Sequence, residues 1–218
     1  RYGAFIRTKF PTNCEAHLSE SLLGACSRQN LSLKALYLLK KLRRKTMNDI
    51  INIGGLKAKP GQRVHGFITI GNDEFTLPAT IIRGTETGKT ALITAGVHAG
   101  EYVGIQSAVE LGRDLKIEKM TGTVVIVKVV AREEFEHRYG SFSRENGQNL
   151  NRVFPGKKDG TTYEKLAYAV VEELHKIADY YIDLHSGDDY EKLTPYVYYA
   201  GKADAEVVKI SCQMAEQV

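Results

Sequence analysis

The sequence has few cysteines and no long apolar run, and both absences narrow the class of protein. Its 218 residues include three cysteines, Cys14, Cys26 and Cys212, and no Cys-x-x-Cys pair. This pattern disfavours a disulfide-stapled domain, so we expect a reducing, cytoplasmic location. No apolar stretch approaches the roughly 18 to 20 residues of a transmembrane helix, so no membrane span is expected.

The composition is that of a globular protein. Hydrophobic residues make up 43% of the chain, enough to bury a sizeable core. The length fits one large domain, or one domain with an appendage.

Positive charge is concentrated at the N-terminus. The net charge is +4, but residues 1–46 contain ten basic and two acidic residues, which leaves 20 basic and 24 acidic residues in the rest. The leader therefore carries a net charge of +8 and the remainder −4. Because the basic character belongs to the leader, it does not indicate a nucleic-acid partner for residues 47–218.

The leader differs in pattern from the rest of the chain. Residues 31–45 combine helix-forming residues, a broad leucine stripe and many basic side chains. Such a helix can lie on a membrane surface or bind an acidic partner, and the alternative is a solvated extension. Met47 stands at the compositional boundary, so we divide the chain into a basic leader over 1–46 and a catalytic domain over 47–218.

Beyond Met47, runs typical of strands alternate with runs typical of helices. The predicted strands are Val64–Ile70, Glu74–Ile82, Ala91–Ala95, Thr123–Val130, Tyr180–Leu184 and Tyr196–Tyr199. The predicted helices are Glu101–Leu115, Tyr163–Ile177 and Ala203–Gln217, and the polar stretch Arg132–Gly160 is expected to be a functional loop. This order predicts an α/β fold with a mixed, partly parallel sheet and helices on both faces.

One segment has the appearance of a phosphate-binding loop. Gly84–Thr90 carries two glycines before Lys-Thr, but three residues separate the glycines where the P-loop motif has four. The chain also continues as a predicted strand instead of opening a helix, so we interpret the segment as a polar turn.

Two histidines and one glutamate lie where strand ends should meet. His98 follows the predicted strand Ala91–Ala95, Glu101 opens the next helix, and His185 ends another predicted strand. The carboxyl ends of strands form the ligand-binding edge of an α/β sheet. A His-Glu-His set suits a catalytic zinc with one open position, whereas the alternative is a hydrogen-bonded structural cluster.

A second set of polar groups lies between these motifs. In Asn149-Leu150-Asn151-Arg152, an arginine stands beside amide side chains. A guanidinium can hold a carboxylate or polarise a carbonyl group. Together with the possible metal ligands, these residues indicate metal-assisted hydrolysis.

These three motifs, in this order, resemble the succinylglutamate desuccinylase and aspartoacylase family of the zinc carboxypeptidase superfamily. The resemblance rests on Gly96–Glu101, Asn149–Gly156 and Asp183–Gly187, and it extends from about Met47 to the end of the sequence. It implies that His98, Glu101 and His185 bind one zinc ion.

The resemblance also assigns the polar groups. It implies that Asn151 and Arg152 bind a substrate carboxylate, and that a further arginine polarises the scissile carbonyl group. Arg138 is the better match for this arginine, and Arg144 is the fallback because loop length varies here.

The sequence departs from the family pattern at the general base. The family takes a catalytic glutamate from a strand well beyond the second histidine motif, and no glutamate of this chain matches it. His137 or Asp188 could substitute, while the remaining glutamates are expected to face solvent: Glu172, Glu173, Glu191, Glu206 and Glu216. We therefore expect a C-terminally truncated enzyme that turns over poorly.

The expected function is a zinc-dependent hydrolase that removes the acyl group from an N-acyl amino acid. One alternative is a carboxypeptidase that acts on short peptides, because it uses much the same metal ligands. A second alternative is a catalytically silent metal-binding domain, because the general base is missing.

Overall fold

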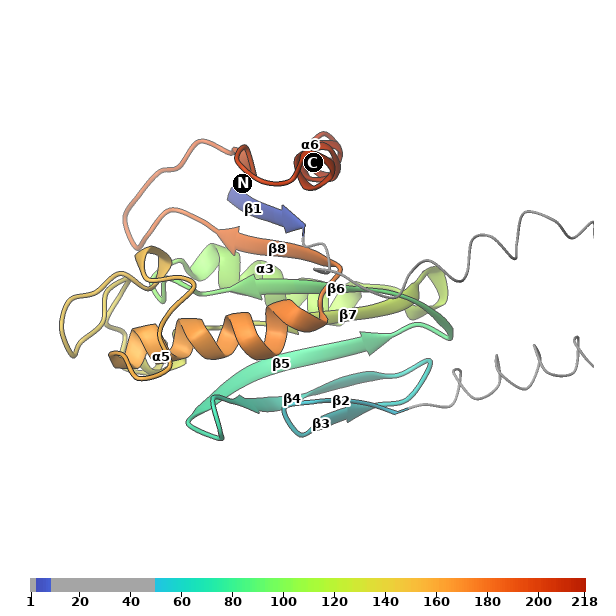
Figure 1. Ribbon diagram of the computed structural model, residues 1–218, viewed down its shortest axis with the longest axis horizontal. Helices are drawn as coiled ribbons and strands as arrows, with labels where there is room; N and C mark the ends of the chain where they lie inside the picture. Colours follow the sequence, from blue (N-terminus) through green and yellow to red (C-terminus); the bar gives the residue numbers. More distant parts are fainter. Residues whose placement is uncertain (1–2, 9–49) are drawn as a thin grey trace, which may run out of the picture.

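The computed structural model describes residues 3–8 and 50–218, and its centre is one mixed sheet flanked by helices (Figure 1). The sheet has seven strands in the order β4-β5-β7-β6-β8-β1-β9, and β2 and β3 form a separate hairpin. The strands are β1 (Gly3–Thr8), β2 (Ile51–Ile53), β3 (Leu56–Ala58), β4 (Arg63–Ile70), β5 (Phe75–Arg83), β6 (Glu86–Ala95), β7 (Thr121–Val127), β8 (Tyr180–His185) and β9 (Val197–Tyr199).

Three parallel strands form the centre of the sheet. β6 pairs in parallel with β7 on one side and with β8 on the other. Val125, Ile126 and Val127 of β7 are all fully buried, although neighbouring side chains point to opposite faces. A strand covered on both faces accounts for this continuous apolar run.

Helices cover both faces of the sheet, as the alternating pattern predicts (Figure 1). Leu92 and Val125 pack with the α5 side of the core, whereas Ile93 and Ile126 pack with the α3 side. The helices are α3 (Tyr102–Asp114), α4 (Arg132–Glu136), α5 (Thr162–Ala169) and α6 (Ala205–Ala215), and 3-10 helices span Ile117–Lys119, Leu150–Arg152 and His175–Ile177. The predicted α/β fold class is confirmed.

Most predicted elements are present, with shifted ends. The predicted strands 64–70 and 74–82 form β4 and β5, which pair antiparallel as a hairpin around Asn72 and Asp73, both in the left-handed region. The predicted helix 163–177 is α-helical only to Ala169, and it continues as a π-helix over Val170–Leu174 and then as a 3-10 helix. The β2–β3 hairpin was not predicted, because its strands are only three residues long.

The segment that resembles a phosphate-binding loop is part of a strand. β6 begins at Glu86, and an irregularity in its pairing with β7 lies between Glu86 and Thr90. No helix starts at Lys89, so the backbone offers no helix N-terminus for a phosphate. The predicted polar turn is therefore too long, because Glu86–Thr90 belong to β6, and the absence of phosphate binding stays a prediction.

The first residues of the leader take part in the sheet. β1 pairs antiparallel with β8 and parallel with β9, and so lies between two strands of the C-terminal part. The predicted helix over 31–45 lies outside the described residues, and the division at residue 46 stays a prediction. Within the part of the chain that the structure describes, no helix is long and apolar enough to cross a membrane.

A capping box fixes the start of α5. The Thr161 side chain accepts a hydrogen bond from the Glu164 backbone N–H, and the Glu164 carboxylate accepts one from the Thr161 N–H. Replacing an N-cap threonine with alanine costs about 1 kcal/mol. We therefore expect Thr161→Ala to lower the free energy of unfolding by about 1 kcal/mol in urea denaturation. Thr162→Ala, which leaves both capping bonds in place, is the control, and equal effects of the two changes would contradict the prediction.

Candidate metal centre and substrate pocket

The candidate site lies where β6 and β8 end side by side. Ala95 of β6 pairs with Leu184 of β8, so the chain leaves both strands at the same edge. After β6 the backbone turns at Gly96, whose φ of 62° favours glycine. This turn brings His98 into the connection before α3 and leaves Glu101 as the residue that precedes the helix.

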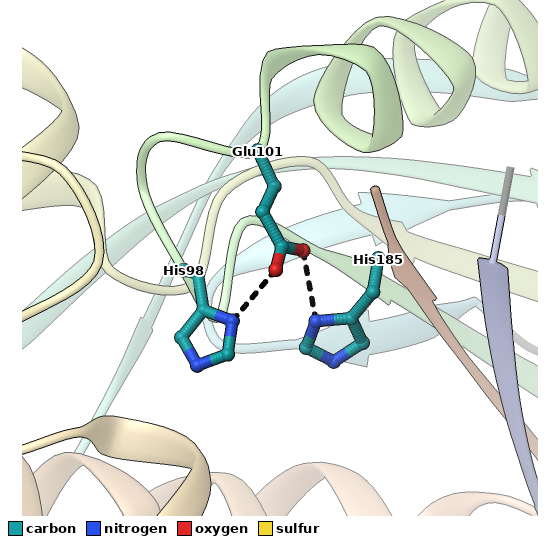
Figure 2. Close-up of side chains that lie close together, drawn as sticks. All are labelled: His98, Glu101 and His185. Atoms are coloured by element: carbon teal, nitrogen blue, oxygen red, sulfur yellow. Dashed lines mark hydrogen bonds and ion pairs between the residues drawn. The ribbon is translucent and has the colours of Figure 1, made fainter. Parts of the chain in front are cut away.

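The three predicted metal ligands are brought together. The Nδ1 atom of His98 lies 2.8 Å from one Glu101 carboxylate oxygen, and the Nδ1 atom of His185 lies 2.8 Å from the other. Figure 2 shows both rings turned toward this carboxylate. The possible ligand atoms of the three residues all lie within 4.8 Å of one another. Chain segments far apart in the sequence therefore place two imidazoles and one carboxylate around one point.

Each histidine is held from behind by a second polar side chain. The Nε2 atom of His98 lies 3.0 Å from the Asn149 side-chain oxygen, and the Nε2 atom of His185 lies 2.9 Å from the Asp183 carboxylate. The Asn149 oxygen also accepts the backbone N–H of Asn151, which identifies it as an acceptor. Both Nε2 atoms therefore donate, and in a neutral ring this leaves the Nδ1 lone pair free for a metal ion.

Sequence analysis did not assign these orienting roles to Asn149 and Asp183. One signal for Asp183 was present, because residues two apart in a strand share a face and Asp183 precedes His185 by two. Asp183 is buried, and the Thr94 hydroxyl of β6 donates to it at 2.5 Å. The contact of Asn149 with His98 depends on how a long loop returns to the sheet edge, which local sequence patterns do not indicate.

The cluster is partly buried and strongly coupled by charge. The side chains of His98, Glu101 and His185 are 13%, 9% and 14% exposed. Burial alone would raise the pKa of Glu101, but hydrogen bonds from His185 and His98 and their charges lower it to about 2. Burial alone would lower the pKa of His185, but Asp183 and Glu101 raise it to about 10. This environment therefore favours the carboxylate form of Glu101, which binds metals, and the protonated form of His185, so metal binding would have to displace the His185 proton.

The same residues open onto a pocket of about 410 Å³. Asn151 and Arg152, from the 3-10 helix over Leu150–Arg152, line it together with His98, Glu101 and His185. The predicted carboxylate-binding residues are thus beside the predicted metal ligands. Tyr196, Tyr198 and Glu191 form another part of the lining. Glu191 was expected to face solvent, and although it is exposed, its side chain contributes to this pocket.

The other predicted residues lie elsewhere. Arg138 and Arg144 are exposed and do not appear among the described residues that line the pocket, and Arg144 lies 4.0 Å from Glu133. Of the two substitute bases, His137 bonds the backbone carbonyl of Glu133, and Asp188 accepts a hydrogen bond from Ser141. Neither contributes to the described pocket lining, and the roles proposed for all four residues stay predictions.

Comparison with known proteins identifies the family. Residues 87–218, more than half of the chain, match the succinylglutamate desuccinylase/aspartoacylase catalytic domain. The chain belongs to this family. The matched segment contains the candidate metal ligands and the Asn149–Arg152 segment of this desuccinylase/aspartoacylase family protein. Residues 1–34 match a separate family of unknown function, DUF6783.

Individual relatives agree with this family. The chain is 36% identical over 149 residues to an N-alpha-acetyl-L-2,4-diaminobutyric acid deacetylase from Halomonas elongata. A succinylglutamate desuccinylase structure from a Silicibacter species matches at 32% identity with a TM-score of 0.53. A succinylglutamate desuccinylase/aspartoacylase structure from Rhodobacter sphaeroides matches at 27% identity with a TM-score of 0.50.

Each matched region covers a larger share of this chain than of the relative. They include 65%, 65% and 58% of this chain for the Halomonas, Silicibacter and Rhodobacter proteins, respectively. They include 43%, 44% and 40% of those relatives, so the chain spans less than half the length of the proteins that it resembles.

Proposed function

We propose that this protein is a zinc-dependent hydrolase that removes an acyl group from an N-acyl amino acid. The observation that carries the proposal is the His98–Glu101–His185 cluster, which shares one pocket with Arg152. The family is consistent with this chemistry, and the Halomonas relative is named as a deacetylase of an N-acyl amino acid. The coexistence of a metal-binding set and a carboxylate-binding group matches a substrate with an amide and a free carboxylate.

The residues present fit a zinc ion. Two imidazole nitrogens and one carboxylate oxygen are ligands that zinc prefers in catalytic sites, where a fourth position stays open. Asp183 and Asn149 supply the outer contacts that fix ligand histidines in such sites. When bound, zinc would acidify a water molecule and polarise the carbonyl group of the substrate.

Arg152 supplies binding and orientation. Arg152 is exposed and lines the pocket, and among the described residues its guanidinium donates one long hydrogen bond, of 3.3 Å, to the Asn151 carbonyl oxygen. It can therefore form two parallel hydrogen bonds with a substrate carboxylate. A carboxylate held there places the neighbouring amide at a fixed distance from His98 and His185, which reduces the entropy lost on reaching the reactive geometry.

No glutamate of this chain matches the general base of the family, and a role for His137 or Asp188 in its place stays a prediction. A positioned base contributes about 10²–10⁴-fold to turnover. Apart from the candidate ligand Glu101, Glu191 is the acidic residue that lines the pocket within the described part of the chain, and its carboxylate accepts the Asp188 backbone N–H at 3.3 Å. We therefore propose that this chain turns over slowly relative to the longer relatives that it resembles.

The proposed function is tested by assaying the zinc-loaded protein against N-acetyl and N-succinyl amino acids and blocked dipeptides. Release of free amino acid from the N-acyl amino acids, dependent on added zinc, would support the proposal. Cleavage of peptides alone would identify a carboxypeptidase. Zinc binding without cleavage of any substrate would indicate a silent metal-binding domain.

Asp183 offers a test of how the ligand histidine is oriented. Loss of such an outer contact typically lowers metal affinity by about 10- to 100-fold. We therefore expect Asp183→Asn to weaken zinc binding by this factor, measured by competition with a chelator, while the protein stays folded. Asp179→Asn is the control. It makes the same chemical change just before β8 begins, where Asp179 pairs with Lys89 at 3.0 Å. Unchanged zinc affinity in Asp183→Asn would contradict the prediction.

A further inference from the structure

One carboxylate outside the pocket lies where three chain segments of the candidate metal centre meet. Asp188 follows His185 by three residues and is half-buried in the turn after β8. One oxygen of its carboxylate accepts a hydrogen bond from the Ser141 hydroxyl, and the other accepts the Asp189 backbone N–H at 3.1 Å. The Glu191 backbone N–H donates to the Asp188 carbonyl oxygen at 2.6 Å. Both the side chain and the backbone of Asp188 are therefore held in place.

The first segment that Asp188 contacts is the connection that carries two of the candidate ligands. Gly100 is buried next to Glu101, and a Cβ atom at Gly100 would overlap one oxygen of the Asp188 carboxylate. The absence of a side chain therefore lets this carboxylate pack against the backbone of the connection. A second contact joins the same two segments, because the Ser186 N–H donates to the Glu101 carboxylate at 3.0 Å. The connection between β6 and α3 thus rests against the turn after β8.

The second segment is the loop that orients His98. Ser141 is buried and immediately precedes Phe142, which forms an isolated bridge with Asn149. The side-chain oxygen of Asn149 in turn lies 3.0 Å from the Nε2 atom of His98. The bond from Ser141 to Asp188 therefore anchors this loop close to the residue that holds the histidine ring.

The surroundings of Asp188 favour support of the site over direct contact with a substrate. Asp188 does not appear among the described residues that line the pocket, whereas all three candidate ligands do. Both of its carboxylate oxygens already accept hydrogen bonds from the chain. Contacts behind a metal site hold the ligand side chains in the geometry that the ion requires.

From these contacts we infer that Asp188 is a positioning residue, which joins the Gly100 connection and the Ser141 loop to the end of β8 and so raises the affinity of the site for zinc. The inference rests on the proposed function, because it takes the three candidate ligands as a zinc site. It gives Asp188 a supporting role in place of a general-base role. The carboxylate acts on the ligands through the two segments that it contacts, and not through a bond to the substrate.

The test compares zinc affinities, measured by competition with a chelator. Asp188→Ala removes both side-chain hydrogen bonds, so it should weaken zinc binding by about 10-fold, the lower end of the range for an outer contact. Gly100→Ala should weaken binding as well, because the added Cβ atom displaces the carboxylate. Asp188→Asn should keep most of the affinity, since an amide can still accept the Asp189 N–H and donate to the Ser141 oxygen.

Two matched controls separate this effect from general damage to the fold. Asp189→Ala removes the neighbouring carboxylate, which is exposed. Gly201→Ala adds a Cβ atom at a glycine where, beyond its chain neighbours, no described atom would lie within 4 Å of it. Both controls should bind zinc like the unaltered protein. Circular dichroism establishes that each variant is folded, and if Asp188→Ala does not fold, Gly100→Ala and Ser141→Ala provide the comparison.

Turnover distinguishes positioning from catalysis. A general base contributes about 10²–10⁴-fold, so a loss of that size in kcat for Asp188→Asn, with unchanged zinc affinity, would assign Asp188 to catalysis and overturn the inference. Equal zinc affinity in the unaltered protein, Asp188→Ala and Gly100→Ala would also overturn it. Weaker zinc binding in these two variants, with recovery in Asp188→Asn, supports the inference even if no N-acyl amino acid is cleaved, which separates it from the proposed function.

Discussion

Replacing His98 with alanine is expected to abolish stable zinc binding by this protein. The unaltered chain should retain about one zinc ion after dialysis against a mild chelator, because a three-ligand site with one open position binds one ion. Loss of an outer contact alone costs about 10- to 100-fold in affinity, so loss of a ligand should cost more than about 100-fold. His98 occupies the loop after β6 and bonds both Glu101 and Asn149, and among the described residues it belongs to the one group of three that could hold a metal ion.

His137→Ala is the matched control for this experiment. His137 is exposed, bonds a backbone carbonyl, and does not contribute to the described lining of the pocket. Its replacement should leave zinc content unchanged. Metal analysis of the three proteins, together with circular dichroism to establish that each is folded, gives the answer. Equal zinc content in the unaltered protein and His98→Ala would reject the assignment.

The second large effect is expected at Arg152. Hydrogen bonds to charged groups contribute about 1.5–3 kcal/mol, so Arg152→Ala should raise KM for N-acyl amino acids by roughly 10- to 150-fold. Arg152→Lys should recover only part of this loss, because an ammonium cannot form the two parallel bonds of a guanidinium. Steady-state kinetics with an N-acyl amino acid, and with the same compound as its methyl ester, measure the effect. The ester should bind poorly to both variants and to the unaltered protein.

Arg138→Ala and Arg144→Ala serve as comparisons in the same assay. A fall in kcat without a rise in KM would be the sign of carbonyl polarisation, the role that the resemblance assigns to Arg138 or, failing that, to Arg144. Zinc content should be unchanged in all four arginine variants. A KM that does not depend on Arg152 would exclude this residue from carboxylate binding.

Parts of the fold could be predicted because their signals are local. The β4–β5 hairpin follows from two β-rich runs around Gly-Asn-Asp, and α3 follows from helical spacing after a glycine turn. The predicted strand 123–130 became β7 over Thr121–Val127, because its register with β6 and β5, and not its apolar run, sets where pairing stops. The change from α-helix to π-helix after Ala169 could not be predicted, because Val170–Leu174 contains neither glycine nor proline to indicate a helix end.

The sequence by itself determined the elements and the ligand types: a strand that ends before His98, a helix that follows Glu101, and a strand that ends at His185. These depend on contacts between near neighbours in the chain, so short patterns contain them. Only the tertiary structure decided that Asn149 and Asp183 hold the two rings, that Glu191 lines the pocket, and that β1 lies between β8 and β9. Each of these joins segments that are distant in sequence or depends on where a loop closes, and the packing of the whole sheet determines that geometry.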